Sequence, residues 1–162
     1  MDKGITVDQV KIATKNLKSV DIRPAFFIQF GYPGETKDDI RLTIKMINTL
    51  LPSEIGISVS YPLPGTVFYE KVKAELAEKA NWTDSDEMKL MFANTYRPEF
   101  YKRLHSYVHS NYRKHIAIQH IRNLLNNPLH MNFLSLKKAC SWLYYLPVAT
   151  IEKFKLKKLE HA

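Results

Sequence analysis

The chain has 162 residues, of which 45% are hydrophobic, so it can bury a core and is not disordered by composition. Its one cysteine, Cys140, excludes a disulfide framework, an iron–sulfur cluster or an all-cysteine zinc site built by this chain alone. The net charge of +8 is divided unevenly: residues 1–96 hold 12 Lys and Arg against 13 Asp and Glu, whereas residues 97–162 hold 12 against 3.

The first elements predicted along the chain are a helix and a strand. Thr6 can cap a helix, and the residues after it place apolar side chains at helical spacing: Val7, Val10, Ala13, Leu17 and Val20. Pro24 ends this helix, because the residue before a proline avoids the helical region. Residues 25–30 are short, apolar and bounded by turn residues, which predicts a buried strand of a parallel sheet.

A second helix and a second strand follow. Thr36 is again a cap, and the helix after it buries a stripe formed by Ile40, Ile44, Ile47 and Leu51. In residues 54–61, large apolar side chains alternate with glycine and serine, which predicts a strand with two different faces. In a β/α barrel, the large face would pack on helices and the small face would line the lumen.

The alternation of helices and strands predicts parallel β/α units. Thr66 caps a third predicted helix, which runs to about residue 79. Two strands are too few for an independent parallel sheet, because both faces and both edges need cover. We therefore expect an α/β fold: a partial (β/α) barrel fragment with two parallel β/α units at residues 1–80, followed by an α-helical, basic C-terminal region at residues 81–162.

The C-terminal region is predicted to be entirely helical. We expect a short helix at 83–95, a long helix from Pro98 to the break at 126–128, and another helix at 131–146 before a lysine-rich end. Cys140 lies among apolar residues of the last helix and is predicted to be buried. His105 and His109 have a spacing that can bind a metal, but no third ligand is evident, so no metal site is predicted.

Three segments together resemble one family. They are residues 1–6, the Phe-Phe-Ile-Gln-Phe-Gly-Tyr-Pro-Gly-Glu-Thr segment at 26–36, and the Ile-Gly-Ile-Ser-Val-Ser-Tyr-Pro-Leu-Pro-Gly-Thr segment at 55–66. Their order and separation resemble the last third of the radical S-adenosylmethionine core, in the cobalamin-binding subgroup that includes the anaerobic magnesium-protoporphyrin IX monomethyl ester oxidative cyclase. Asn81, Trp82 and residues 96–113 are similar to the tail of that subgroup, so the resemblance covers about residues 1–114.

The resemblance implies a set of cofactor-binding residues. In the family, strand ends and a glycine-bearing turn contact the adenine and ribose of S-adenosylmethionine. Ligands of parallel barrels bind at the C-terminal ends of strands, and glycine allows a close backbone approach there. The matching positions here are Gln29, Phe30 and Gly31, with Gly34 and Glu35 shaping the turn, and then Ser58, Ser60, Tyr61, Pro62 and Leu63. Many relatives have an aliphatic residue where this chain has Gln29.

The departures from the family pattern imply a fragment. The family holds its [4Fe–4S] cluster with a Cys-x3-Cys-x2-Cys loop, and this chain lacks that loop. The acidic-glycine segment that grips the methionine amino group and the upstream cobalamin-binding domain are lacking too. Relatives are oxidoreductases or methyltransferases, but this chain is expected to supply one wall of the site, to hold no cofactor and no catalytic residue of its own, and to be inactive alone. S-adenosylmethionine, a [4Fe–4S] cluster and, as a further candidate, cobalamin would belong to the full-length relative.

The expected partner is the missing N-terminal part of the barrel, in cis or in trans, as in a truncated gene, a split gene or a cloned fragment. Self-association through exposed strand edges is a further expectation. The alternative is a non-catalytic interaction module. Its basic helices would bind a membrane surface or an acidic partner, or would be only a solvated cap; nucleic acid is disfavoured because no recognised motif accompanies the charge. With no apolar run of about 18 residues, no spanning helix is predicted, and we expect a cytoplasmic protein or one peripheral to the inner membrane face.

Overall fold

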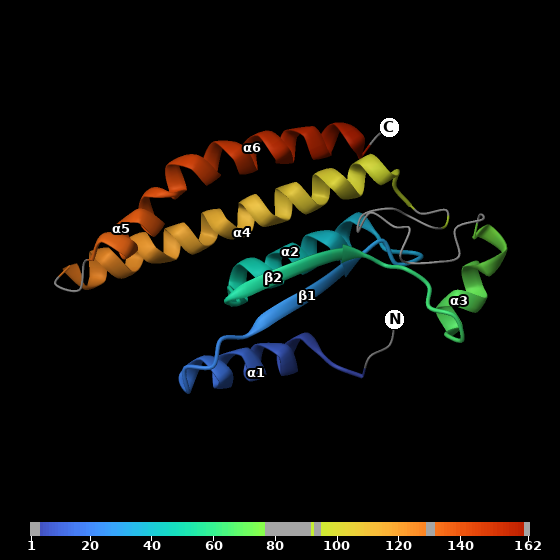
Figure 1. Cartoon of the computed structure of the whole chain (residues 1–162), viewed down its shortest axis with the longest axis horizontal. Helices are drawn as coiled ribbons and strands as arrows, with labels where there is room; N and C mark the ends of the chain where they lie inside the picture. The colour runs from blue at the N-terminus through green and yellow to red at the C-terminus, as the bar shows by residue number, and fades with distance from the viewer. Residues whose placement is uncertain (1–3, 77–91, 93–94, 129–131, 161–162) are drawn as a thin grey trace.

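The computed structural model describes residues 4–76, 92, 95–128 and 132–160 of the chain (Figure 1). The fold is mixed α/β and mostly helical, with a two-stranded parallel sheet among the described residues. In chain order, its elements are α1 (Val7–Ser19), β1 (Ala25–Phe30), α2 (Lys37–Leu50), β2 (Glu54–Val59), α3 (Val67–Val72), a 3-10 turn η1 (Lys73–Glu75), α4 (Pro98–Asn126), α5 (Phe133–Cys140) and α6 (Trp142–Leu159).

The two strands pair in the parallel arrangement that the sequence predicts. α2 connects them, and their register places Ile28 beside Ile57 and Phe30 beside Val59. The ladder extends past the end of β2, because the Ser60 amide donates to the Phe30 carbonyl at 2.7 Å. The two β/α units, β1–α2 and β2–α3, are therefore confirmed.

All three predicted threonine caps are confirmed. The hydroxyl groups of Thr6, Thr36 and Thr66 each accept a hydrogen bond from a first-turn amide of the helix that follows. At α2 the cap is reciprocal, because the Thr36 amide donates to Asp39 Oδ2 at 2.9 Å. Local side chains thus fix where α2 begins, directly after the turn that leaves β1.

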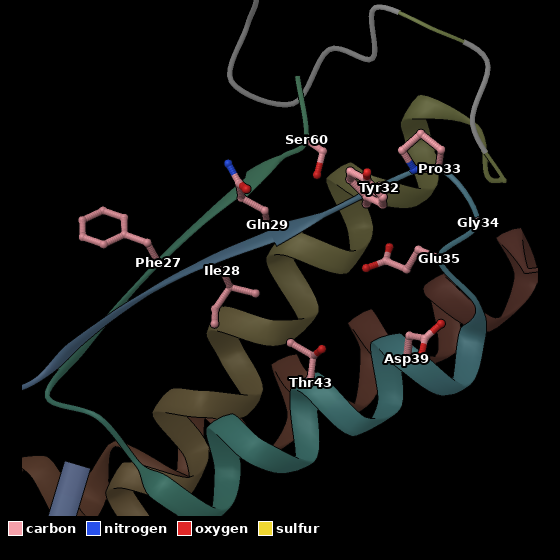
Figure 2. A pocket seen from close by; sticks show the side chains of 10 residues that line it. All are labelled: Phe27, Ile28, Gln29, Tyr32, Pro33, Gly34, Glu35, Asp39, Thr43 and Ser60. Carbon is pink, nitrogen blue, oxygen red and sulfur yellow. The ribbon is translucent and has the colours of Figure 1, made fainter. Parts of the chain in front are cut away.

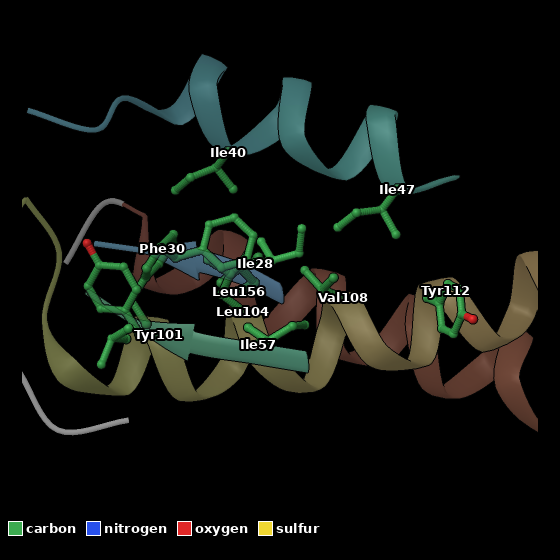
Figure 3. Packing of buried hydrophobic residues seen from close by; sticks show 12 residues of the cluster. Ile28, Phe30, Ile40, Ile47, Ile57, Tyr101, Leu104, Val108, Tyr112 and Leu156 are labelled. Carbon is green, nitrogen blue, oxygen red and sulfur yellow. The ribbon is translucent and has the colours of Figure 1, made fainter. Parts of the chain in front are cut away.

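The hydrophobic core lies between one face of the sheet and the long helices (Figure 3). Ile28, Phe30, Ile57 and Val59 come from the sheet, and the other buried members come from α2, α4 and α6: Ile40, Ile47, Phe100, Tyr101, Leu104, Val108, Tyr112 and Leu156. One core is therefore shared by residues on both sides of the predicted division at residue 80.

The opposite face of the sheet is open among the described residues. Phe27, in the middle of β1, is 89% exposed, and Gln29 is exposed beside it. The prediction that β1 is a buried strand therefore holds for one face only. The reason is that helices cover one face only, so each second residue of the strand faces outward.

The C-terminal helices form a hairpin in which α6 lies antiparallel along α4 (Figure 1). The predicted single helix at 131–146 is wrong in extent, because the chain divides at Ser141 and α6 continues to Leu159 through the lysine-rich segment. Ala149 and Leu156 are buried and hold α6 in place. No helix in the described part of the chain is long and apolar enough to cross a membrane.

Two smaller predictions also change. Cys140 is exposed rather than buried, because the buried side of α5 is the side that carries Ala139. The third helix is shorter than predicted: α3 ends at Val72, tightens into η1 and gives way to extended backbone at Leu76. The helix predicted at 83–95 lies outside the described residues except at Phe92 and Thr95.

Candidate functional site: a polar hollow at the strand ends

An open hollow of about 570 Å³ lies where β1 ends and α2 begins (Figure 2). Its lining comes from two elements and two connecting segments: Phe27, Ile28 and Gln29 of β1, Tyr32, Pro33, Gly34 and Glu35 of the turn, Asp39 and Thr43 of α2, and Ser60 after β2. This is the C-terminal edge of a parallel sheet, where α/β proteins bind ligands.

The turn between β1 and α2 holds a half-buried carboxylate at the hollow. Gly31 and Gly34 both have positive φ angles, 78° and 82°, which glycine adopts without strain. In this conformation the Gly31 amide donates to Glu35 Oε2 at 2.8 Å. Burial raises the pKa of Glu35, the Gly31 hydrogen bond opposes that rise, and the nearby charge of Asp39 adds to it. The turn therefore fixes one acidic acceptor at the rim.

Ser60 places an unpaired hydroxyl in the same hollow. Its side chain is 2% exposed, and Oγ has no hydrogen-bond partner among the described residues. A buried hydroxyl without a partner is costly, so such groups are commonly satisfied by a ligand or by water. In Figure 2 the Ser60 hydroxyl lies between the Gln29 and Tyr32 side chains. Ser60 is thus the lining residue that most directly indicates a missing partner.

A second buried hydroxyl lies behind the turn. Tyr101 of α4 is fully buried, and its Oη also lacks a hydrogen-bond partner in the described part of the chain. Burial raises the pKa of Tyr101, the charges of Glu35 and Tyr96 raise it further, and the nearby Tyr96 backbone opposes the rise. The hydroxyl therefore stays protonated beside that carboxylate.

Asp39 contributes to the lining but is already engaged. Its Oδ2 accepts from both the amide and the hydroxyl of Thr36, and the two distances are 2.9 and 2.6 Å. These hydrogen bonds hold the pKa of Asp39 below its usual value. The groups that remain for a ligand are the Gln29 amide, the Glu35 carboxylate and the hydroxyls of Tyr32, Thr43 and Ser60.

The structure brings together part of the predicted site. Gln29, Gly34, Glu35 and Ser60 line one hollow, and Gly31 orients Glu35 through its amide. Ser58 pairs with Gln29 in the sheet register, so its side chain shares the open face.

Six of the ten predicted residues do not line the hollow: Gly31 and Ser58, whose places are given above, and four others. The Phe30 side chain is buried in the core on the other face of the sheet, because the strand alternates. Tyr61, Pro62 and Leu63 follow β2 and lie outside the lining.

Sequence reasoning did not select six of the ten lining residues, namely Phe27, Ile28, Tyr32, Pro33, Asp39 and Thr43. Tyr32 is held by Phe68 of α3, with their ring centroids 5.0 Å apart. Asp39 and Thr43 are one helical turn apart on α2, so they face the same side. That spacing, counted from the Thr36 cap, is the signal that would have found the two α2 residues.

The described residues contain no group of three or more His, Cys, Asp or Glu side chains that could hold a metal ion. His105 and His109 do lie together on α4, with ring centroids 4.5 Å apart. Neither histidine is among the residues that line the hollow.

In comparisons with known proteins, no family model and no curated protein matches this chain. The family resemblance therefore rests on the residues of the three segments described above.

Proposed function

We propose that this chain forms one wall of a radical S-adenosylmethionine barrel and that the hollow at its strand ends contacts the adenosine part of the cofactor. We also propose that the two parallel β/α units are a fragment of a partial (β/α) barrel. In this proposal the chain is inactive alone and supplies no catalytic residue.

The observation that supports the proposal most strongly is the unpaired Ser60 hydroxyl at the C-terminal edge of the sheet. Adenosine offers ribose hydroxyls and ring nitrogens, which need hydrogen-bond donors and acceptors. Ser60 can donate and accept, Gln29 can do both through its amide, and Glu35 accepts. The donor and acceptor set of the hollow therefore fits a nucleoside, although Gln29 replaces the aliphatic wall that many relatives have.

The residues present do not fit an iron–sulfur cluster. A [4Fe–4S] cluster of this family needs three closely spaced cysteines, and Cys140 is the single cysteine of the chain. It lies exposed at the end of α5, far along the chain from the strand ends. In the family, S-adenosylmethionine bound to that cluster supplies the radical that abstracts a hydrogen from the substrate. The cluster, and cobalamin where it is used, would have to be held by another part of the protein.

The open face of the sheet supports the proposal that further strands of a barrel cover it in the larger protein. Phe27, Gln29, Gly56 and Ser58 occupy the face that would line the lumen of a barrel, and Phe27 is almost fully exposed there. In a closed barrel, inward side chains from further strands fill this space. The partner proposed here is accordingly the N-terminal part of the barrel, joined in cis or supplied in trans.

The first test is the DNA immediately upstream of the codon for Met1 and the neighbouring reading frames. We expect a frame that encodes a Cys-x3-Cys-x2-Cys loop. The protein that contains both parts should bind a [4Fe–4S] cluster and S-adenosylmethionine when purified without oxygen. In that protein, Ser60→Ala should weaken S-adenosylmethionine binding about fivefold in calorimetry, the value of one neutral hydrogen bond.

Ser106→Ala is the matched control, because Ser106 is an exposed serine of α4 that bonds only its own helix, at Lys102. Its affinity should equal that of the unchanged protein. The proposal is wrong if no upstream or neighbouring frame encodes the cysteine loop, or if both serine variants bind the cofactor equally well.

A further inference from the structure

The outer face of α6 carries apolar side chains that nothing in the described part of the chain covers. Leu143, Ile151 and Phe154 are 69%, 52% and 62% exposed. Together with Pro147, they recur every three or four residues, so they form one stripe along the helix. Ala149 and Leu156 are buried on the opposite side, where α6 packs along α4 (Figure 1). The stripe therefore points away from the protein.

Lysines border this stripe on both sides. Helical spacing places Lys153 and Lys157 on one side of it and Lys155 and Lys158 on the other, and all four are exposed. The Lys158 ammonium group lies 4.8 Å from the centroid of the Phe154 ring, so its stem runs beside the stripe.

Acidic groups do not offset this charge. Between residues 133 and 159 the chain has six lysines and one acidic residue, Glu152. The Glu152 side chain is only 12% exposed and is engaged by Arg103 of α4 at 3.4 Å and by Lys155 at 3.0 Å. The exposed surface of α5 and α6 is thus cationic as well as apolar.

We propose that the outer face of α6, extended by exposed Phe133 and Leu134 of α5, docks on an anionic lipid membrane surface. An apolar stripe flanked by lysines is the pattern of a helix that lies in the interface between headgroups and acyl chains. The lysine stems can reach up to lipid phosphates while the stripe enters the apolar boundary below them. This inference does not depend on the proposed cofactor site.

Other occupants fit this face less well. A second copy would bring two sets of lysines together, which is repulsive. Nucleic acid would neutralise the lysines but offers no apolar surface to the stripe. An acidic protein would need an apolar ridge in register with the stripe, whereas a lipid surface supplies anionic headgroups above acyl chains without that requirement.

The test is co-sedimentation of the full chain with vesicles of phosphatidylcholine alone and of phosphatidylcholine mixed with phosphatidylserine. We expect binding to the mixed vesicles only, and the binding should weaken as salt is raised. Replacing Leu143, Ile151 and Phe154 with serine should weaken it at least about tenfold. Replacing Lys155, Lys157 and Lys158 with glutamine should weaken it by up to about a hundredfold.

The matched control replaces Val7 and Ile12 of α1 with serine, since both are similarly exposed apolar residues on another helix. This variant should bind mixed vesicles like the unchanged chain. All substituted side chains are exposed, and far-UV circular dichroism checks that each variant keeps its helices.

The proposal is overturned if the unchanged chain does not bind mixed vesicles, or if the serine triple variant binds them as well as the control. Binding that only the lysine substitutions abolish would also overturn it, and would favour an acidic protein or nucleic acid.

Discussion

At the scale of single residues, two buried tyrosines on α4 differ in whether the hydroxyl has a partner. Tyr112 Oη donates to the Pro52 carbonyl at 2.6 Å and so ties α4 to the loop before β2. Tyr101 is more deeply buried, at 0% exposed against 7% for Tyr112, but its Oη has no hydrogen-bond partner among the described residues. Both rings belong to one hydrophobic core, so removing each hydroxyl tests the value of the hydrogen bond.

Tyr112→Phe should lower the free energy of unfolding by about 1–3 kcal/mol, because it leaves the Pro52 carbonyl buried without a donor. Tyr101→Phe should change the free energy by less than about 1 kcal/mol or increase it, because no hydrogen bond is lost. Urea unfolding followed by circular dichroism measures both variants. An equal loss in the two variants would contradict this account of the core.

At the scale of elements, the parts of the fold that local residues determine could be predicted. The threonine caps and the two strands depend on neighbours within a few positions, so Thr36 and residues 54–59 are found where the pattern places them. The division between α5 and α6 could not be predicted in this way. Ser141 keeps helical angles, and α5 and α6 both pack against α4, which sequence spacing does not report.

Pro147 is a second feature of α6 that local sequence patterns do not predict, and it can be tested by substitution. It lies inside α6, where it lacks an amide donor and its ring crowds the Leu143 carbonyl one turn earlier. Contacts with α4 therefore retain a helix that local propensity disfavours. Pro147→Ala should raise the free energy of unfolding by about 1–3 kcal/mol and raise the melting temperature.

The control for that substitution is Thr150→Ala, on the same exposed face of α6. Thr150 donates only to its own helix, at Leu146, so its replacement tests general helix propensity without the proline effect. If Pro147→Ala stabilises the chain no more than Thr150→Ala does, α6 accommodates the proline without cost and the reasoning fails.

At the scale of the whole molecule, the candidate site could be only half predicted. The family resemblance implied Gln29 and Ser60, and both line the hollow where the ends of the parallel strands meet at one edge. The burial of Phe30 and the exposure of Phe27 follow from which face the helices cover, and that choice is made by the whole packing arrangement. The sequence of β1, in which large side chains occur on both faces, does not indicate which face helices will cover.

This open face predicts how the isolated chain behaves in solution. Phe27 lies 89% exposed over Gly56 of the neighbouring strand, and the adjacent strand edges have no partner in the described part of the chain. An exposed apolar sheet face with free edges favours association between copies. Phe27→Ser should therefore reduce concentration-dependent self-association in sedimentation velocity. It should change the free energy of unfolding little, because the ring buries little area.

Leu42→Ser is the control, since Leu42 is also well exposed but lies on α2, on the covered side of the sheet. Equal association in the unchanged chain and in both variants would show that this face stays unoccupied in the isolated chain.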